Sequence, residues 1–460
     1  MSRSSPHSAS SRRGRKPKGK FSSFDEVVKE LRDRAATFPD ARNPNASAYR
    51  YSMEDCTASA FSVFYFQHSS FLDAQRKLQN KTHRNNAQTL FGIEQIPSDP
   101  HIRKCLDPVD PSLLAPLIFG IGESLFQQGH LSPYDTRFGF LPTLDGTQTV
   151  SSDKISCPSC LKRKKAKDSE EVTYSHAAVT PVLVRPGESS VIPLPPEFIG
   201  RDDGTSKQDC EICAGTRWIE SYLPRYREFG RITVMGDDLY SHEPFCRKVL
   251  ELGCDFLFVC KESSHKTLSE YLKGCTTVVL KRHEKGVRKK KRLLHTYRFM
   301  NGTPLSGQED ALRVNWFSLE ITDEDSGERI FYNSWATSHT ITPEILEDLS
   351  ACARSRWHIE NGNNNPLKTK GYHLSHNFGH GEVFLSNTLT TLNILAFLLH
   401  RAQEFWDAGY CTARSLMPRI AFFDILRVLT SFAVFPSFDR LIEFLLEDDP
   451  DLRRLILDTS

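Results

Sequence analysis

Residues 138–145 (FGFLPTLD) and 231–237 (RITVMGD) decide the fold of this chain. Each stretch is a short run of mainly apolar residues that closes on an acidic residue, Asp145 in the first and Asp237 in the second. Short apolar runs of this kind predict buried strands. Pro142 disfavours a central position for the first strand, because proline cannot donate to a sheet ladder. The two stretches therefore predict strands that each present a carboxylate at the C-terminal end.

The elements around these two strands follow a definite order. Composition and periodicity predict further strands at 172–184, 191–194 and 255–260, and helices at 209–229 and 243–252. Three strands, a helix, a strand, a helix and a strand is the order of an α/β ribonuclease H-like domain. In that topology the fourth strand lies parallel beside the first. We therefore expect Asp145 and Asp237 to lie side by side at one end of the sheet.

Flanking composition divides the rest of the chain. Helical patterns with proline punctuation come first, and short β-rich runs follow residue 275. The expected segments are a disordered basic tail at 1–21, a helical DNA-binding N-terminal domain at 22–131, the first part of the catalytic domain at 132–274, a β-rich insertion at 275–335, the second part of the catalytic domain at 336–400 and a helical C-terminal region at 401–460.

A third carboxylate, Glu360, lies in a stretch with a helical pattern over residues 342–360. Arg356 precedes it by four residues, so the two side chains share one helix face. Alone, such a pair is usually a surface ion pair. Three carboxylates brought together by a fold suit hard divalent cations such as Mg²⁺, which prefer oxygen ligands. Two such ions can clamp the attacking and leaving oxygens of a phosphodiester.

These residues carry a resemblance to a known family. The runs LDGT (144–147), VMGD (234–237) and RWHIE (356–360) resemble the three acidic motifs of DDE transposases of bacterial insertion sequences, in the insertion-sequence-four-like group. That group has a spaced Tyr, Arg, Glu and Lys signature. This chain matches it at Arg356 and Glu360, carries Ala353 at the tyrosine position, and has Lys368 one residue beyond the usual spacing.

The resemblance implies a function, cofactors and partners. It implies a metal-dependent enzyme of DNA transposition and recombination that cuts at transposon ends and transfers the 3′-hydroxyl strand into target DNA. Asp145, Asp237 and Glu360 would be catalytic and would hold two Mg²⁺ or Mn²⁺ ions, with Arg356 and Lys368 in support. The implied partners are terminal inverted repeats and target DNA, bound by a homodimer. A metal-dependent nuclease without strand transfer and a repurposed, inactive DNA-binding protein are the alternatives.

Two Cys-x-x-Cys pairs predict a structural zinc site. Cys157 with Cys160, and Cys210 with Cys213, each suit one edge of a tetrahedral Zn–S₄ centre. Forty-nine residues lie between the pairs, more than in a compact zinc finger. His176 is an alternative ligand, and four unrelated buried thiols are the simpler reading. The histidines at 373, 376 and 380 are assigned to DNA-backbone contact or to structure rather than to a second metal site.

Basic clusters predict contact with nucleic acid, although the net charge is only +2. The N-terminal tail carries seven Lys or Arg in its first twenty residues, and two further clusters lie at 162–167 and 288–292. The expected DNA-binding residues are Arg13, Arg15, Lys16, Arg288, Lys289 and Lys290.

The location of the protein is predicted from its apolar stretches. Residues 1–20 lack the apolar segment of a signal peptide, and apolar runs elsewhere are short or interrupted by charge. We therefore expect a cytoplasmic protein without membrane contact, associated with the nucleoid if bacterial. Its twelve cysteines should then be thiols or metal ligands.

Overall fold

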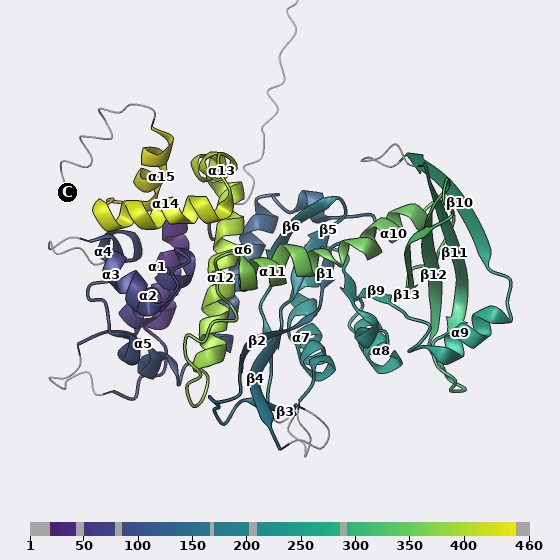
Figure 1. Ribbon diagram of the computed structural model, residues 1–460, viewed down its shortest axis with the longest axis horizontal. Helices are drawn as coiled ribbons and strands as arrows, with labels where there is room; N and C mark the ends of the chain where they lie inside the picture. The colour runs from purple at the N-terminus through teal and green to yellow at the C-terminus, as the bar shows by residue number, and fades with distance from the viewer. Residues whose placement is uncertain are drawn as a thin grey trace, which may run out of the picture.

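A large mixed sheet runs through the centre of the molecule (Figure 1). This computed structural model describes residues 19–42, 50–78, 85–165, 170–201, 209–285 and 292–447. The strands of the sheet are β1 Leu141–Thr143, β5 Val182–Arg185, β6 Glu188–Pro193, β8 Thr233–Gly236, β9 Asp255–Val259, β10 Val278–Lys285, β11 Arg292–Pro304, β12 Arg313–Asp323 and β13 Arg329–Thr337. Their spatial order is β10-β11-β12-β13-β9-β8-β1-β5-β6. With helices packed around this sheet, the predicted α/β class is confirmed.

Parallel pairing is confined to the centre of this sheet. β8 pairs parallel with β1 on one side and with β9 on the other. The other pairings of the sheet are antiparallel, including β5 beside β1 and β13 beside β9. The C-terminal ends of β1, β8 and β9 therefore lie at one edge, where the loops that follow them can form a site.

A second, smaller sheet was not predicted from the sequence. It contains β2 (Gly146–Ser152), β3 (Leu161–Lys164) and β4 (Val172–Val179), in the order β2-β4-β3, and β7 (Glu197–Ile199) also pairs with β4. The single strand predicted at 172–184 is in fact two strands, β4 and β5, in different sheets. The break falls at Thr180 and Pro181, where proline lacks the N–H needed to continue a ladder.

The β-rich insertion extends the large sheet instead of forming a separate unit. β10 to β13 form an antiparallel meander, and β13 joins β9 with Trp335 opposite Val259. A short helix, α9 (Lys266–Lys273), precedes β10 and was not predicted. Figure 1 places this meander at one end of the molecule, opposite the N-terminal helices.

Helices from both ends of the chain lie together at the other end of the molecule (Figure 1). They are α1 Phe24–Ala35, α2 Met53–Tyr65, α3 Phe71–Leu78, α4 Asn86–Phe91, α5 Asp99–Leu106, α6 Ala115–Gln127, α12 Leu385–Trp406, α13 Ala408–Ser415, α14 Arg419–Phe432 and α15 Phe438–Leu446. Tyr65 donates a hydrogen bond of 2.6 Å to Gln403 inside this core. Phe24 stacks on Phe438, with ring centroids 4.6 Å apart. The N-terminal and C-terminal helices thus share one buried core.

Candidate functional site

Asp145 and Asp237 follow two adjacent parallel strands. Thr143 of β1 lies opposite Met235 of β8, and the Leu144 N–H donates to the Met235 carbonyl at 2.8 Å. Asp145 is the next residue after this bond, and Asp237 is the first residue after β8. The Asp237 carboxylate accepts a hydrogen bond of 2.8 Å from the Leu239 N–H, which fixes the turn after the strand. The structure thus places both carboxylates at the same edge of the sheet.

Glu360 reaches this edge on a π-helix, not on the continuous α-helix predicted over 342–360. The helix α10 (Leu346–Ser355) ends before Arg356, and a π-helix covers Ile359–Asn364. Single-turn π-helices are rare and often lie at functional sites. A further short helix, α11 (Asn365–Thr369), carries Lys368.

The π-helix is held close to both sheets by small and polar residues. A Cβ atom at Gly362 would lie 2.5 Å from the Ser189 carbonyl oxygen of β6, so only glycine allows this approach. Asn364 donates to the Asp145 carboxylate at 3.1 Å and accepts from the Thr180 hydroxyl at 3.0 Å. These bonds join the element that carries Glu360 to the loop that carries Asp145.

The charges around Asp145 describe one electrostatic site. Burial raises the pKa of Asp145 to about 7, and the negative charges of Glu211, Asp237 and Glu360 act in the same direction. Arg356 opposes this rise in the pKa of Asp145. Burial also lowers the pKa of Lys368, against the attraction of Asp145.

The structure thus brings the five residues predicted for the catalytic centre into one neighbourhood: Asp145, Asp237, Arg356, Glu360 and Lys368. The three carboxylates are spread out, however. Among the described residues, the oxygen atoms of these three carboxylates do not all lie within 4.8 Å of one another, as the atoms of a compact metal site would.

Glu211 is a fourth carboxylate that the sequence analysis missed. Its Oε1 accepts hydrogen bonds from the Gly146 N–H at 2.9 Å and from the Tyr240 hydroxyl at 3.0 Å. Burial raises the pKa of Glu211, and repulsion from Asp237 adds to the rise. Glu211 begins the helix α7 (Glu211–Tyr226), between the two cysteines of the second Cys-x-x-Cys pair. The sequence does contain a signal for Glu211. It is an acidic residue in the first turn of the helix that precedes the strand ending at Asp237.

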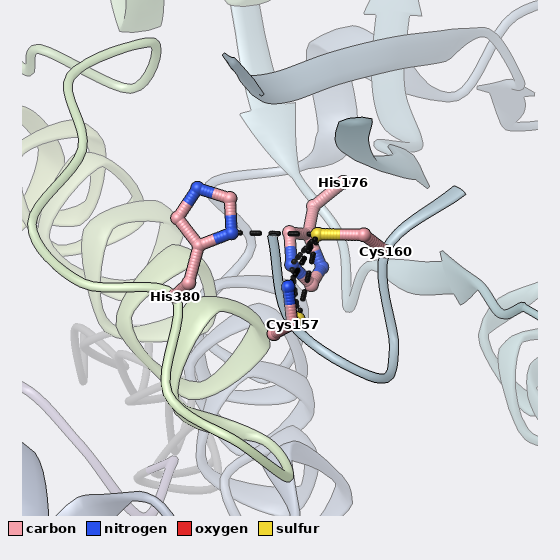
Figure 2. A group of neighbouring side chains, drawn as sticks. All are labelled: Cys157, Cys160, His176 and His380. Atoms are coloured by element: carbon pink, nitrogen blue, oxygen red, sulfur yellow. Dashed lines mark hydrogen bonds between the residues drawn. The ribbon is translucent and has the colours of Figure 1, made fainter. Parts of the chain in front are cut away.

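A compact Cys/His cluster lies beside the smaller sheet (Figure 2). Its members are Cys157, Cys160, His176 and His380, whose ligand atoms all lie within 4.8 Å of one another. The two sulfurs are 3.4 Å apart, and His176 Nε2 lies 3.2 Å from Cys157 Sγ and 3.4 Å from Cys160 Sγ. His380 Nδ1 lies 3.4 Å from Cys160 Sγ. This arrangement could hold one metal ion.

This cluster corrects the four-cysteine prediction. Leu161 of β3 pairs with Ser175 of β4, so strand pairing brings Cys160 next to His176. Cys210 and Cys213 lie instead at the start of α7, with their sulfurs 3.3 Å apart, and belong to neither ligand group found among the described residues. His380, assigned above to DNA contact or structure, occupies the position expected for a second-pair cysteine.

The second ligand group of the described residues is less suited to a cation. Cys56, His101 and Cys105 come together between α2 and α5. The Arg42 guanidinium lies 2.9 Å from His101 Nε2. The fixed positive charge of Arg42 beside these ligands opposes the binding of a metal cation to them.

A cleft of about 580 Å³ opens next to Arg356. It lies between the C-terminal end of α10 and the strands β9 and β13, and its lining includes Arg354 and Trp357. The Trp357 side chain is 57% exposed, and the Arg354 guanidinium lies over the Phe331 ring at 5.2 Å. The cleft therefore offers cations and aromatic faces next to Arg356, and Asp145, Asp237 and Glu360 are not part of its lining.

The predicted DNA-binding residues Arg13, Arg15, Lys16, Arg288, Lys289 and Lys290 lie outside the described residues. In the remaining basic cluster, Lys162, Arg163 and Lys164 lie exposed on β3. Lys165 follows β3 and forms ion pairs with Asp153 and Glu171. Part of this basic surface is therefore already neutralised within the chain.

No protein-family model and no curated protein matches this chain. No single helix among the described residues is long and apolar enough to cross a membrane, and α5 with the segment Pro111–Gln127 meets that test only as a pair bent by 88°.

The raised pKa of Asp145 predicts how stability depends on pH in metal-free protein. Its pKa rises from 3.8 to about 7 on folding, so the folded state binds more protons than the unfolded state in this range. The free energy of unfolding should therefore fall as pH rises through this window, and Asp145→Asn should remove much of that fall. Urea denaturation in the presence of a chelator at pH 5 and pH 8 measures both.

Asp348→Asn is the matched control, because Asp348 is a carboxylate on α10 whose side chain is 60% exposed. It should leave the pH dependence unchanged. An Asp145→Asn protein with the same pH dependence as the wild type would contradict the burial of this charge.

Proposed function

We propose that this chain is a DDE-type DNA transposase that cleaves at transposon ends and joins the freed 3′-hydroxyl to target DNA. The observation that carries the proposal is the convergence of Asp145, Asp237 and Glu360 at one edge of the sheet. Arg356 and Lys368 accompany these carboxylates. The triad comes from segments far apart in the sequence, so no local propensity explains its assembly.

The strand arrangement supports a ribonuclease H-like catalytic domain. β5 and β6 lie antiparallel on one side of β1, and β8 and β9 lie parallel on the other side. This is the arrangement expected for the predicted order of elements. The β10 to β13 meander precedes the helices that lead to Glu360, as the insertion of the resembled group does.

The donor set fits two divalent ions, Mg²⁺ or Mn²⁺. Asp145, Asp237 and Glu360 supply only oxygen ligands, which these ions prefer. Their oxygen atoms do not all lie within 4.8 Å of one another, so together they would not hold a single small ion. Two ions, each bound by some of the carboxylates and about 3.5–4 Å apart, are the arrangement that the proposal requires. When bound, such a pair stabilises the attacking and leaving oxygens of a phosphodiester. The Cys/His cluster adds one structural Zn²⁺ to the cofactors of this proposal.

Other residues of the chain position the carboxylates and the DNA. Asn364 orients the Asp145 carboxylate through its amide, and Glu211 holds the backbone at Gly146. Arg356 and Lys368, whose charges act on Asp145, would contact the scissile phosphate. In this proposal the polar neighbours of Asp145 serve to align the site or to supply charge.

The cleft beside Arg356 suits a DNA strand end. Bases stack on exposed aromatic rings, and arginine side chains contact phosphates. Trp357, Arg354 and Arg356 bring both features to its lining. The proposed partners are the terminal inverted repeats and target DNA, bound by a homodimer, in the cytoplasm and on the nucleoid if the chain is bacterial.

Loss of any one carboxylate should abolish the chemistry. Asp145→Ala, Asp237→Ala and Glu360→Ala should each reduce Mg²⁺-dependent cleavage of terminal DNA by roughly a thousandfold or more, because groups that act as a unit are not additive. DNA affinity should change little. Gel assays of end cleavage and of binding, on DNA carrying the repeats that flank the coding region, measure the two effects separately.

Asp348→Asn, on the exposed face of α10, should cleave like the wild type. An Asp145→Ala protein that cleaves at the wild-type rate would reject the assignment. Cleavage by the wild type without joining to a second duplex would indicate a nuclease, and binding without cleavage would indicate a repurposed DNA-binding protein.

Glu211 should position the site without binding metal. Both of its hydrogen bonds fall on Oε1, which glutamine retains, so Glu211→Gln should keep cleavage within roughly threefold. Glu211→Ala removes both bonds and should lower cleavage by about 10–100-fold, as other supporting residues of metal sites do. If Glu211→Gln is as inactive as Asp145→Ala, Glu211 is a metal ligand.

The N-terminal tail should contribute to DNA affinity but not to catalysis. Six of its seven cationic side chains would neutralise phosphates, each adding roughly −0.9 to the slope of log affinity against log salt, and the seventh, Lys20, already pairs with Glu30 at 2.8 Å. Deleting residues 1–20 should weaken binding and flatten this slope, and cleavage of bound DNA should persist. An unchanged slope in fluorescence-anisotropy titrations would show that the tail does not contact DNA.

A further inference from the structure

We propose that Cys157, Cys160, His176 and His380 bind one Zn²⁺ ion, and that this ion fastens the loop between α11 and α12 to the smaller sheet. The four residues come from three separate segments: the loop before β3, the strand β4 and the loop before α12. Figure 2 shows His380 on the opposite side of the cluster from Cys160, with its ring nitrogen directed at the Cys160 sulfur.

The distances between the ligand atoms fit a tetrahedral zinc centre. Zn–S bonds of about 2.3 Å and Zn–N bonds of about 2.0–2.1 Å require S···S and S···N separations of about 3.8 and 3.6 Å. The observed separations are 3.4 Å between the sulfurs and 3.2–3.4 Å between sulfur and nitrogen. Each of these four edges needs to open by only a few tenths of an ångström to admit the ion, and the two remaining edges, from His380 to Cys157 and to His176, lie within 4.8 Å.

The surroundings of the ligands suit zinc as well. Cys160, His176 and His380 are buried, with exposed fractions of 0%, 5% and 7%. His176 directs Nε2 at both sulfurs, so this nitrogen is the atom that would bind the ion. Asn387 of α12 hydrogen-bonds the His176 side chain, as partners behind a metal ligand do.

The loop that carries His380 has an irregular backbone. It spans residues 370–384, and Gly371, His373, Gly379 and Gly381 all have positive φ angles. Asp107 accepts hydrogen bonds from the Glu382, Val383 and Leu385 N–H groups at its end. A bond from zinc to His380 would add an attachment in the middle of this loop, 220 residues away from Cys160 in the sequence.

The same cluster is connected to the carboxylates through β4. His176 lies on this strand, and four residues later the Thr180 N–H donates to the Asp145 carbonyl at 3.1 Å. The Thr180 hydroxyl donates to Asn364 at 3.0 Å. The zinc would therefore fix two segments that lie on either side of the carboxylates: β4, and the chain that follows Lys368. The assignment of the zinc ligands is independent of the proposed function. Only the expected effect of zinc on DNA cleavage rests on the proposed function.

The experiment is metal analysis of the full chain purified without chelators. Wild-type protein should contain one zinc per chain by elemental analysis. Replacement by Co²⁺ should give the visible bands of a tetrahedral site together with thiolate-to-metal charge transfer. Cys157→Ser and His380→Ala should lose the metal. The Cys210→Ser/Cys213→Ser double variant is the matched control and should retain it.

A rescue variant separates ligation from folding. His380→Cys supplies a thiolate in place of the imidazole, so it should retain zinc and the Co²⁺ spectrum, whereas His380→Ala should not. Hydrogen exchange should show residues 371–384 protected with zinc and exposed after chelation. Zinc retained by both His176→Ala and His380→Ala would overturn the ligand set. A zinc-free wild type with a Cys157–Cys160 disulfide would overturn the metal site altogether.

Cleavage assays then separate this inference from the proposed transposase activity. If the zinc site and the proposed function are both correct, His380→Ala should lose zinc and cleave DNA more slowly. Normal zinc content in a wild type that never cleaves DNA would reject the proposed function and leave the metal site in place.

Discussion

The parallel pairing of β1 with β8 is the constraint on which the candidate site depends. It fixes Thr143 opposite Met235 and so brings Asp145 and Asp237 to one edge of the sheet. The cost of this placement is electrostatic, because burial and like charges raise the pKa of Asp145 to about 7. Nothing in the packing of the sheet requires charge at this position. A buried carboxylate retained among other carboxylates is typical of a functional site.

The sequence predicted the ends of β1 and β8 well, because apolar runs that close on an acidic residue are local patterns. It failed where the outcome depended on distant partners. Residues 172–184 have the composition of one strand, yet Pro181 divides them between two sheets. Residues 342–360 have the periodicity of one helix, yet the chain changes to a π-helix at Ile359, and Gly362 of this π-helix approaches β6 closely. Glu211 escaped notice because its role comes from Gly146 and Tyr240, both far away in the sequence.

The cysteines illustrate the same limit. Two Cys-x-x-Cys pairs look alike as sequence, and spacing alone cannot say which pair has further ligands nearby. Pairing of β3 with β4 supplies His176 to the first pair, and the loop before α12 supplies His380. The second pair lies at the start of α7, where Glu211 in the first turn accepts a hydrogen bond from the Gly146 N–H next to Asp145. Register within a small, unpredicted sheet therefore decided the ligand set.

The two proposed metal sites are chemically distinct although one strand connects them. Thiolate and imidazole ligands select zinc, and carboxylates select Mg²⁺ or Mn²⁺. Each site would therefore resist the other's ion through ligand type, with no need for a physical barrier. β4 carries His176 in one site and leads directly to Thr180, which contacts Asp145 and Asn364 in the other. A closed tetrahedral zinc site exchanges no ligand during a reaction, so it can act as a fixed support. In the proposed DNA complex, the open carboxylate site would then be free to rearrange while its sheet-side wall stays in place.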